Sequence, residues 1–439
     1  MGMGQQKSWN TLLSWLTVAI VFLFVVATVL PKANASTPIP TVNPSQGFNN
    51  YVYAITPAGD GTGDIYVGGA FSIYNGMGSH RIVRFNSDGT VDTGFVVGSG
   101  YDNEVRTIAR VGDGTGDIYV GGSFITYNGI RSPQIIRLNT DGTVDRQFAI
   151  GSGFNGEVRA IVPVGDGTGD IYVGGFFTTY NGRNSNRIIR LNSNGTVDTG
   201  LVVRSGFNNS VFTISPVADD TGDLYVGGFF TAYNEIGSNR MIRLNSDGTV
   251  DRAFLVGTGF NNSVFSILPI GDGTGAIYAG GSFTTYNGTR SNRIVRLNPD
   301  GTANMGFSSG SGLNGFVYTI TRANDLTWDI YVGGDFSTYN GTRGNRMIRL
   351  NPDGTVDAGF AVGSGFNNNV YAITPVEEVE GEIYVGGVFT AYNGISHSRM
   401  IRAHPDGTID AGFAVGLGFN SETHFISPTT SHNGSNRLF

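Results

Sequence analysis

Arginine and aspartate side chains recur along this chain at one fixed spacing, and they are the first candidates for chemistry. In most units an aspartate such as Asp64 precedes the arginine and another such as Asp92 follows it. A guanidinium group forms bidentate pairs with carboxylates, including buried ones. We therefore expect structural ion pairs at these positions rather than substrate binding. The repeated arginines are Arg84, Arg137, Arg190, Arg243, Arg296, Arg349 and Arg402.

Oxygen-bearing side chains also gather in the segment Asn86-x-Asp88-Gly89-x-x-Asp92, which the other units repeat with small changes. Calcium loops place several oxygen ligands at alternate positions. Here Arg84 stands where the first acidic ligand would be, and a turn held by Asn and Asp side chains explains the same residues. We therefore predict no metal site and no cofactor, and keep calcium binding as the alternative.

Both patterns belong to a unit of 53 residues that occurs seven times without insertion or deletion. A fixed period of this size indicates a solenoid, a propeller or an array of one supersecondary unit. The units begin at Gly47, Gly100, Gly153, Gly206, Gly259, Gly312 and Gly365. Residues 418–439 restart the unit as a degenerate, partial eighth repeat.

Each unit holds four short stretches of β-branched and aromatic residues, which is typical of strands. In the first unit these are 52–55, 65–69, 81–85 and the residues around 95–97. Asp-Gly pairs separate them, as in hairpins. The pattern predicts an all-β fold over 47–417, a seven-bladed β-propeller of four-stranded antiparallel blades. A right-handed β-solenoid is the alternative.

Two adjacent glycines end the second stretch of every unit, Gly68 and Gly69 in the first. Glycine inside a strand indicates a β-bulge or a close approach of two backbones. We therefore interpret both glycines, like the repeated arginines, as structural positions.

The unit also resembles the delta-60 repeat β-propellers of exported bacterial proteins, over residues 47–417. The resemblance rests on Ile65-Tyr66-Val67-Gly68-Gly69-x-Phe71, Tyr74-Asn75-Gly76 and Arg84-Phe85-Asn86-x-Asp88-Gly89-x-Val91-Asp92-x-x-Phe95. It implies the propeller fold. It implies no shared activity, and no functional residue is carried over from it.

Residues 1–35 are a different kind of sequence. Lys7 precedes an apolar run over 12–30, and Ala33-Asn34-Ala35 follows it. This order is typical of a secretory signal, so we predict a hydrophobic signal helix cleaved before Ser36. An uncleaved membrane anchor through 12–30 is the alternative. Residues 36–46 would be a linker, and the protein is expected to be exported to the periplasm, cell surface or medium.

Charge and cysteine content exclude several classes of function. Without residues 1–35 the chain keeps 25 arginines, no lysine and 34 acidic residues, for a formal charge of −9. A nucleic-acid partner needs a basic surface, so none is expected. The absence of cysteine excludes disulfides and thiolate metal sites.

No arrangement of nucleophile, acid and base stands out in the sequence. The five histidines are scattered along the chain, and none recurs at one repeat position. The near-identity of the units also argues against catalysis, because a catalytic site breaks symmetry. We predict no catalytic residue and no enzyme. A hydrolase or lyase at the channel mouth is the alternative, since triad residues meet only in space.

The units differ most in the loop after each Tyr-Asn pair, which should share a face with the loops between blades. Loops on a rigid scaffold commonly carry binding. We expect a monomeric binding scaffold for a protein or a surface glycan, with a purely structural repeat protein as another possibility. The candidate binding residues are Arg131, Arg183, Arg290, Arg343, Phe48, Tyr101 and Phe207. The aromatic ones have an alternative role in packing between blades.

Overall fold

The computed structural model describes residues 47–219 and 221–413. The predicted signal helix or anchor (1–35), the linker (36–46) and the partial eighth repeat (418–439) lie outside the described residues. The described part of the chain is all-β, and it contains no helix long and apolar enough to span a bilayer.

Each unit folds into a three-stranded antiparallel sheet and a separate short hairpin. In the first unit the sheet has the order β1-β2-β5, and β3 pairs with β4. The innermost strands are β1 (Val52–Pro57), β6 (Val105–Arg110), β11 (Val158–Pro163), β16 (Val211–Pro216), β21 (Val264–Pro269), β26 (Val317–Arg322) and β31 (Val370–Pro375). The middle strands are β2 (Ile65–Gly69), β7 (Ile118–Gly122), β12 (Ile171–Gly175), β17 (Leu224–Gly228), β22 (Ile277–Gly281), β27 (Ile330–Gly334) and β32 (Ile383–Gly387).

The third strands and the hairpins complete the units. The third strands are β5 (Ile82–Phe85), β10 (Ile135–Leu138), β15 (Ile188–Leu191), β20 (Met241–Leu244), β25 (Ile294–Leu297), β30 (Met347–Leu350) and β35 (Met400–Ala403). The first four hairpins are β3 (Ile73–Tyr74) with β4 (Met77–Gly78), β8 (Thr126–Tyr127) with β9 (Ile130–Arg131), β13 (Thr179–Tyr180) with β14 (Arg183–Asn184), and β18 (Ala232–Tyr233) with β19 (Ile236–Gly237). The last three are β23 (Thr285–Tyr286) with β24 (Thr289–Arg290), β28 (Thr338–Tyr339) with β29 (Thr342–Arg343), and β33 (Ala391–Tyr392) with β34 (Ile395–Ser396).

The prediction of four-stranded blades is not confirmed. Only Val91 continues the sheet, through a single bridge to Phe85. The chain then turns away, because the Asp92 carboxylate accepts the Gly94 amide at 2.7 Å. Val96 donates its amide to the Asp141 carbonyl of the next unit at 2.8 Å. The stretch expected as a fourth strand therefore ties neighbouring units together instead of extending its own sheet.

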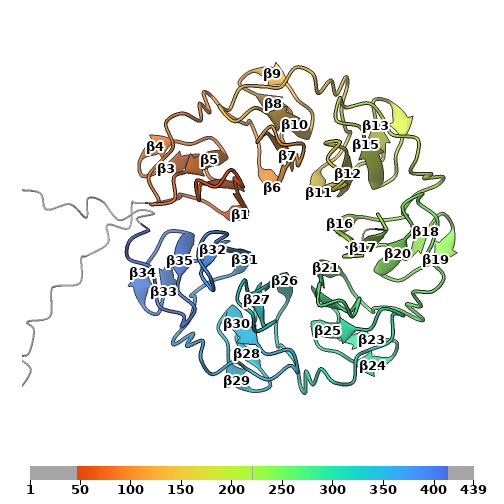
Figure 1. The fold of residues 1–439 in the computed structure, drawn as a ribbon, viewed down its shortest axis with the longest axis vertical. Helices are drawn as coiled ribbons and strands as arrows, with labels where there is room; N and C mark the ends of the chain where they lie inside the picture. Colours follow the sequence, from red (N-terminus) through yellow and green to blue (C-terminus); the bar gives the residue numbers. More distant parts are fainter. Residues whose placement is uncertain (1–46, 220, 414–439) are drawn as a thin grey trace, which may run out of the picture. The chain divides into compact units, whose positions relative to one another are not determined.

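The seven sheets stand around one axis, with the innermost strands facing it and the hairpins at the periphery (Figure 1). The ring closes by packing the seventh sheet on the first. Thr374 of β31 donates its hydroxyl to the Ile55 carbonyl at 2.9 Å, and Arg399 donates to the Phe48 carbonyl at 2.9 Å. The strand β1 pairs with β2 of its own unit, so closure needs no exchanged strand.

The hydrophobic core lies between the sheets rather than at the axis. The middle strands are buried along their whole length, and each core cluster joins residues of two adjacent units. Gly68 makes this packing possible, because a Cβ there would lie 2.6 Å from Val105 Cγ1 of the next unit. Burial on both sides explains why the strands read as nearly continuous apolar runs.

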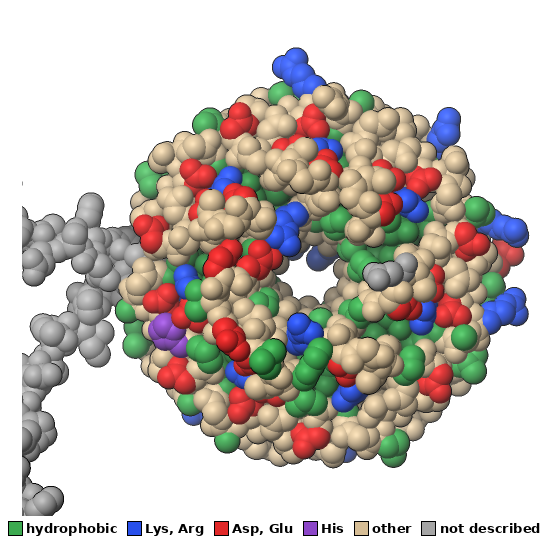
Figure 2. Space-filling view, viewed as in Figure 1, with side chains coloured by type: hydrophobic (Ala, Val, Ile, Leu, Met, Phe, Trp, Pro, Cys, Tyr) green, Lys and Arg blue, Asp and Glu red, His purple; other side chains and the backbone are tan. Residues whose placement is uncertain are grey.

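The loops divide between two faces of the ring. The loops equivalent to 60–63 are here called Asp60-type, and those equivalent to 86–89 are called Asp88-type. They share one face, because Arg84 donates both to Asp60 at 2.6 Å and to the Thr140 carbonyl of the next unit's Asp88-type loop at 3.3 Å. On the face seen in Figure 2, acidic side chains are spread around the ring among arginines, and a central channel is open. The hairpins lie on the other face with the loops between blades, since Asn49 donates its amide to the Ile73 carbonyl at 3.1 Å.

Candidate binding site in the axial channel

A β-bulge in each innermost strand aims one side chain at the axis. Val52 pairs with Gly69 and Ala54 with Gly68, so Tyr53 is the extra residue between them. Gly69 permits the close crossing of the chain, because a Cβ there would lie 2.0 Å from the Tyr51 carbonyl oxygen. Bulges commonly redirect a side chain in this way. The two glycines expected to be structural thus also position the channel residues.

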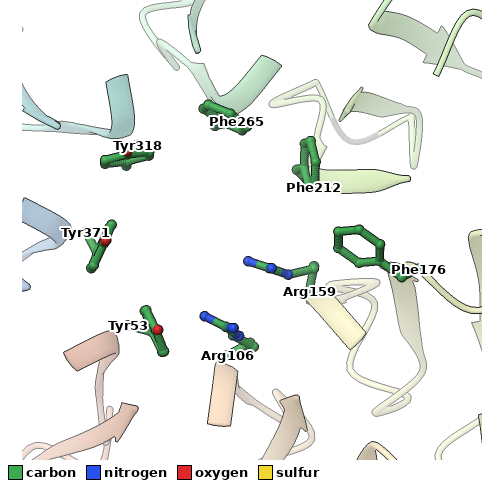
Figure 3. A pocket seen from close by; sticks show the side chains of 8 residues that line it. All are labelled: Tyr53, Arg106, Arg159, Phe176, Phe212, Phe265, Tyr318 and Tyr371. Atoms are coloured by element: carbon green, nitrogen blue, oxygen red, sulfur yellow. The ribbon is translucent and has the colours of Figure 1, made fainter. Parts of the chain in front are cut away.

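The same bulge recurs in all seven units, and the seven bulged residues line one cavity. The cavity has a volume of about 450 Å³, and Phe176 at the end of the third unit's middle strand also lines it. Figure 3 shows these side chains surrounding a shared space. The seven residues, here called the axial ring, are Tyr53, Arg106, Arg159, Phe212, Phe265, Tyr318 and Tyr371.

Most of the axial ring is an unbroken arc of aromatic side chains. Phe212 and Phe265 have ring centroids 5.3 Å apart, and Phe265 and Tyr318 have theirs 5.9 Å apart. Tyr371 continues the arc at 5.0 Å from Tyr318 and 5.5 Å from Tyr53. All these pairs are tilted, the geometry that aromatic quadrupoles favour. The arc therefore offers ring faces and edges from several directions.

Two arginines fill the gap in the arc. The Arg106 guanidinium lies 4.2 Å from the centroid of Tyr53, and that of Arg159 lies 5.2 Å from the centroid of Phe176. Both are within the range of cation–π attraction. Figure 3 shows both guanidinium groups pointing into the cavity, side by side. The cavity thus has an aromatic side and a cationic side.

Glutamates hold this arginine pair from behind. Arg106 donates its Nε–H to Glu157 at 2.7 Å and forms a second ion pair with Glu104. Arg159 Nε lies 3.1 Å from the same Glu157 carboxylate oxygen, without an aligned hydrogen bond. One carboxylate therefore orients two cations by their inner edges. The terminal nitrogens of Arg159 are left directed toward the cavity, whereas Arg106 uses one of its terminal nitrogens in the pair with Glu104.

Burial changes the titration of the cavity groups. It lowers the pKa of Arg159, an effect that Glu157 opposes and the neighbouring Arg106 cation adds to. Arginine nevertheless stays charged in proteins. Burial also raises the pKa of Tyr53 to about 12 against the opposing effect of Arg106, so its hydroxyl is protonated at neutral pH. The site can therefore present charge-assisted donors beside aromatic faces, which suits binding.

The repeated arginines form a different set of contacts, inside the blades. Arg137 lies 2.8, 2.9 and 3.0 Å from the carboxylates of Asp113, Asp117 and Asp145. The fifth unit keeps only one of these contacts, between Arg296 and Asp272 at 3.6 Å. The equivalent arginines of the other units also pair with acidic residues: Arg84, Arg190, Arg243, Arg349 and Arg402. These clusters connect the strands and loops of each blade.

The four candidate binding arginines are exposed, but the structure does not bring them together. They lie in the second strands of hairpins that belong to four different units. A cavity of about 400 Å³ in the second unit is lined by Arg131 together with Asp145 and Arg146. The four, here called the rim arginines, are Arg131, Arg183, Arg290 and Arg343.

The three candidate aromatic residues belong to the core, which corrects the expectation that they face a ligand. Phe48 is 1% exposed, and Tyr101 and Phe207 are each 2% exposed. Phe48 packs with its ring centroid 4.4 Å from that of Phe71. It also bridges Tyr74, whose hairpin is thereby fixed to the start of the unit. The packing role is the one the structure shows.

The Asp88-type loops use their oxygen atoms internally. Asp88 accepts the amide and hydroxyl of Thr90 at 2.9 and 2.6 Å, and Asn86 donates to the same hydroxyl at 2.8 Å. Asp92 pairs with Arg84. Within the described ranges no group of three or more acidic, histidine or cysteine side chains is placed to hold a metal ion.

Sequence reasoning missed the axial ring, although the repeats contain the information. Down the seven units this one position reads Tyr, Arg, Arg, Phe, Phe, Tyr, Tyr. It is always large, yet it changes in charge where its neighbours do not. The side chain at such a position is placed alike in every unit, but it is not required for packing the core. That contrast distinguishes it from the repeated arginines and glycines.

One solved β-propeller structure agrees with this fold. The crystal structure of the WD40 beta propeller domain of Doa1 superposes with a TM-score of 0.53 at 14% identity, over 82% of this chain and 94% of that one. A crystal structure of a mitotic checkpoint complex gives a TM-score of 0.48 at 11% identity, over 84% of this chain and 97% of that one. No curated protein matches the chain.

A family of β-propellers matches the chain once in each unit. Its description is a domain of unknown function, DUF5122 beta-propeller. The matched segments are 61–95, 114–148, 167–201, 221–254, 273–307, 329–360 and 381–413. Together they cover more than half of the residues, so the chain belongs to the DUF5122 β-propeller family.

Proposed function

We propose that this protein is an exported, non-catalytic binding scaffold whose ligand enters the axial cavity. The ligand is a segment of a protein or the end of a glycan. The observation that carries the proposal is the axial ring, where one position has the same geometry in all units but different chemistry. Ligand sites are usually concave and mostly apolar with a few convergent polar groups. The arc and the arginine pair match that description.

The size and accessibility of the cavity support the same proposal. Ligand pockets span roughly 300–1,000 Å³, and the axial cavity of about 450 Å³ falls within that range. An open axis lets a longer molecule place only its end inside. Export is proposed from the N-terminal segment, and the delta-60 resemblance gives the same expectation. Calcium dependence stays a proposal to be tested alongside binding.

A glycan array and a pull-down from surface extracts, each run with and without calcium, test the proposal on the purified full chain. The informative variant combines Phe265→Ala and Tyr371→Ala, which opens the arc without touching the repeated arginines. We expect a ligand whose binding this variant weakens at least tenfold. The matched control replaces the rim arginines with glutamine and should bind normally. A ligand that depends on the rim arginines and ignores the arc would overturn the site.

A further inference from the structure

We propose that the axial cavity recognises the carboxylate of an acidic sugar, a uronic acid unit at the end of a glycan, through Arg159 and Arg106. This inference rests on the proposed function, because it names the ligand class of the same cavity.

Arg159 presents the groups that a carboxylate needs. Its inner edge faces Glu157, and among the described residues its two terminal nitrogens have no hydrogen-bond partner. Guanidinium groups bind carboxylates through two parallel N–H donors. Arg106 lies beside it with its own Nε occupied by Glu157. Arg106 also pairs with Glu104, so Arg159 is the cation whose terminal nitrogens are left for an incoming carboxylate.

The charge across the cavity orients such a ligand. Tyr318 lies on the opposite side of the cavity from Arg159 (Figure 3). Its hydroxyl is 3.4 Å from the carboxylate of Asp335, at the end of the sixth unit's middle strand. An anionic group is therefore drawn toward the terminal nitrogens of Arg159 and repelled by Asp335. A cationic ligand, which aromatic cages often bind, would meet the two arginines instead.

The aromatic arc fits the rest of a sugar. A sugar ring has an apolar C–H face that can pack on an aromatic ring, and hydroxyl groups around its edge. Phe212 and Phe265 supply purely apolar rings, whereas Tyr53 and Tyr371 add hydroxyls at the cavity. A mixture of stacking faces and hydrogen-bonding groups suits a carbohydrate better than a purely apolar ligand.

The test titrates the full chain with digalacturonic acid and with its dimethyl ester, followed by ligand-observed NMR. The ester keeps both rings and removes both charges. We expect the acid to bind at least about tenfold more tightly than the ester, or about 1.4 kcal/mol. Arg159→Gln should abolish that preference. Arg159→Lys, which keeps the charge without the fork, should retain part of it. Arg252→Gln, at an exposed position of the fourth unit outside the axial ring, should bind like the parent.

Each contrary outcome has a defined meaning. Equal binding of acid and ester, or unchanged binding to Arg159→Gln, overturns the carboxylate assignment. Tighter binding of glucose 6-phosphate than of digalacturonic acid overturns it in favour of a phosphate. No binding of digalacturonic acid overturns the inference. The proposed function falls separately, if no ligand from the array or pull-down depends on Phe265 and Tyr371.

Discussion

Arginine has two different roles in this molecule, and the contrast separates scaffold from site. Inside the blades Arg137 is 8% exposed and lies within 3.0 Å of three carboxylates. In the channel Arg159 is 32% exposed and faces one shared carboxylate. The first environment recurs in almost every unit, and within 47–219 and 221–413 the second occurs only where the third unit meets the second. Repetition thus marks residues that hold blades together, and its loss marks the residues directed at a ligand.

The largest effect is expected when the arginine is removed from one of the arginine–carboxylate clusters inside a blade. Arg349 lies 2.6, 2.9 and 3.0 Å from the carboxylates of Asp325, Asp329 and Asp357. Arg349→Ala leaves three carboxylates close together without their cation, and removal of one partner of a buried pair costs about 3–5 kcal/mol. We expect a loss of that order in the free energy of unfolding, measured by urea denaturation.

The fifth unit supplies the matched control, because Ala276 and Asn304 replace two of its three acidic partners. Arg296→Ala should therefore cost clearly less than Arg349→Ala. Equal losses would show that the carboxylate clusters do not decide blade stability.

Acid should weaken the same clusters. Burial would raise the pKa of Asp325, but hydrogen bonds from Thr327 and the charge of Arg349 outweigh it and hold the pKa below 3.8. A carboxyl whose pKa is lower in the folded than in the unfolded chain stabilises the fold at pH values above its unfolded pKa of 3.8. This contribution is lost as the pH falls from 3.8 through the lower pKa of the folded chain. Burial raises the pKa of Asp329, which opposes part of that loss.

We therefore expect Asp325→Asn to have a lower melting temperature than the parent at pH 7 and a smaller further drop between pH 5 and pH 3. Circular dichroism melts at both ends of this range measure the difference. Parallel curves for the two proteins would mean that Asp325 titrates alike in the folded and unfolded chain.

A smaller effect on the free energy of unfolding is expected at the turn of one hairpin. Six units have Asn-Gly at the hairpin turn, but the fourth has Asn234-Glu235. Glu235 adopts φ 67°, a left-handed conformation that costs a non-glycine residue about 1–2 kcal/mol. Glu235→Gly should raise the free energy of unfolding by about 1 kcal/mol.

The reverse change at the same place in the fifth unit is the control. Gly288 has φ 75°, and a Cβ there would meet nothing within 4 Å. Gly288→Glu should therefore lose about as much stability as Glu235→Gly gains. A neutral result for both would remove backbone strain as the explanation.

The smallest effect is expected at the rim arginines. They are exposed and have no shared partner, and surface substitutions of this kind usually change stability by less than about 0.5 kcal/mol. Changing all four to glutamine should leave both the melting temperature and digalacturonic acid binding unchanged. Weaker binding would shift the site from the axis to the hairpins.

Much of the fold could be predicted from the sequence, because the same pattern of turn residues and apolar runs occurs in all seven units. The fourth strand failed for a local reason: the Asp92–Gly94 turn and the Val96 bond to the next unit redirect the chain. Phe48 was ambiguous because an aromatic residue after a turn can pack or face solvent. The site could not be derived from single residues, since the bulge that turns Tyr53 toward the axis depends on pairing with Gly68 and Gly69.

A crystal structure of the full chain with digalacturonic acid tests the central claim most directly. The account predicts a sugar ring against the aromatic arc, with a carboxylate oxygen about 2.7–2.9 Å from a terminal nitrogen of Arg159. A ligand seated on the hairpins or on the Asp60-type loops, with the axial cavity empty, would contradict it.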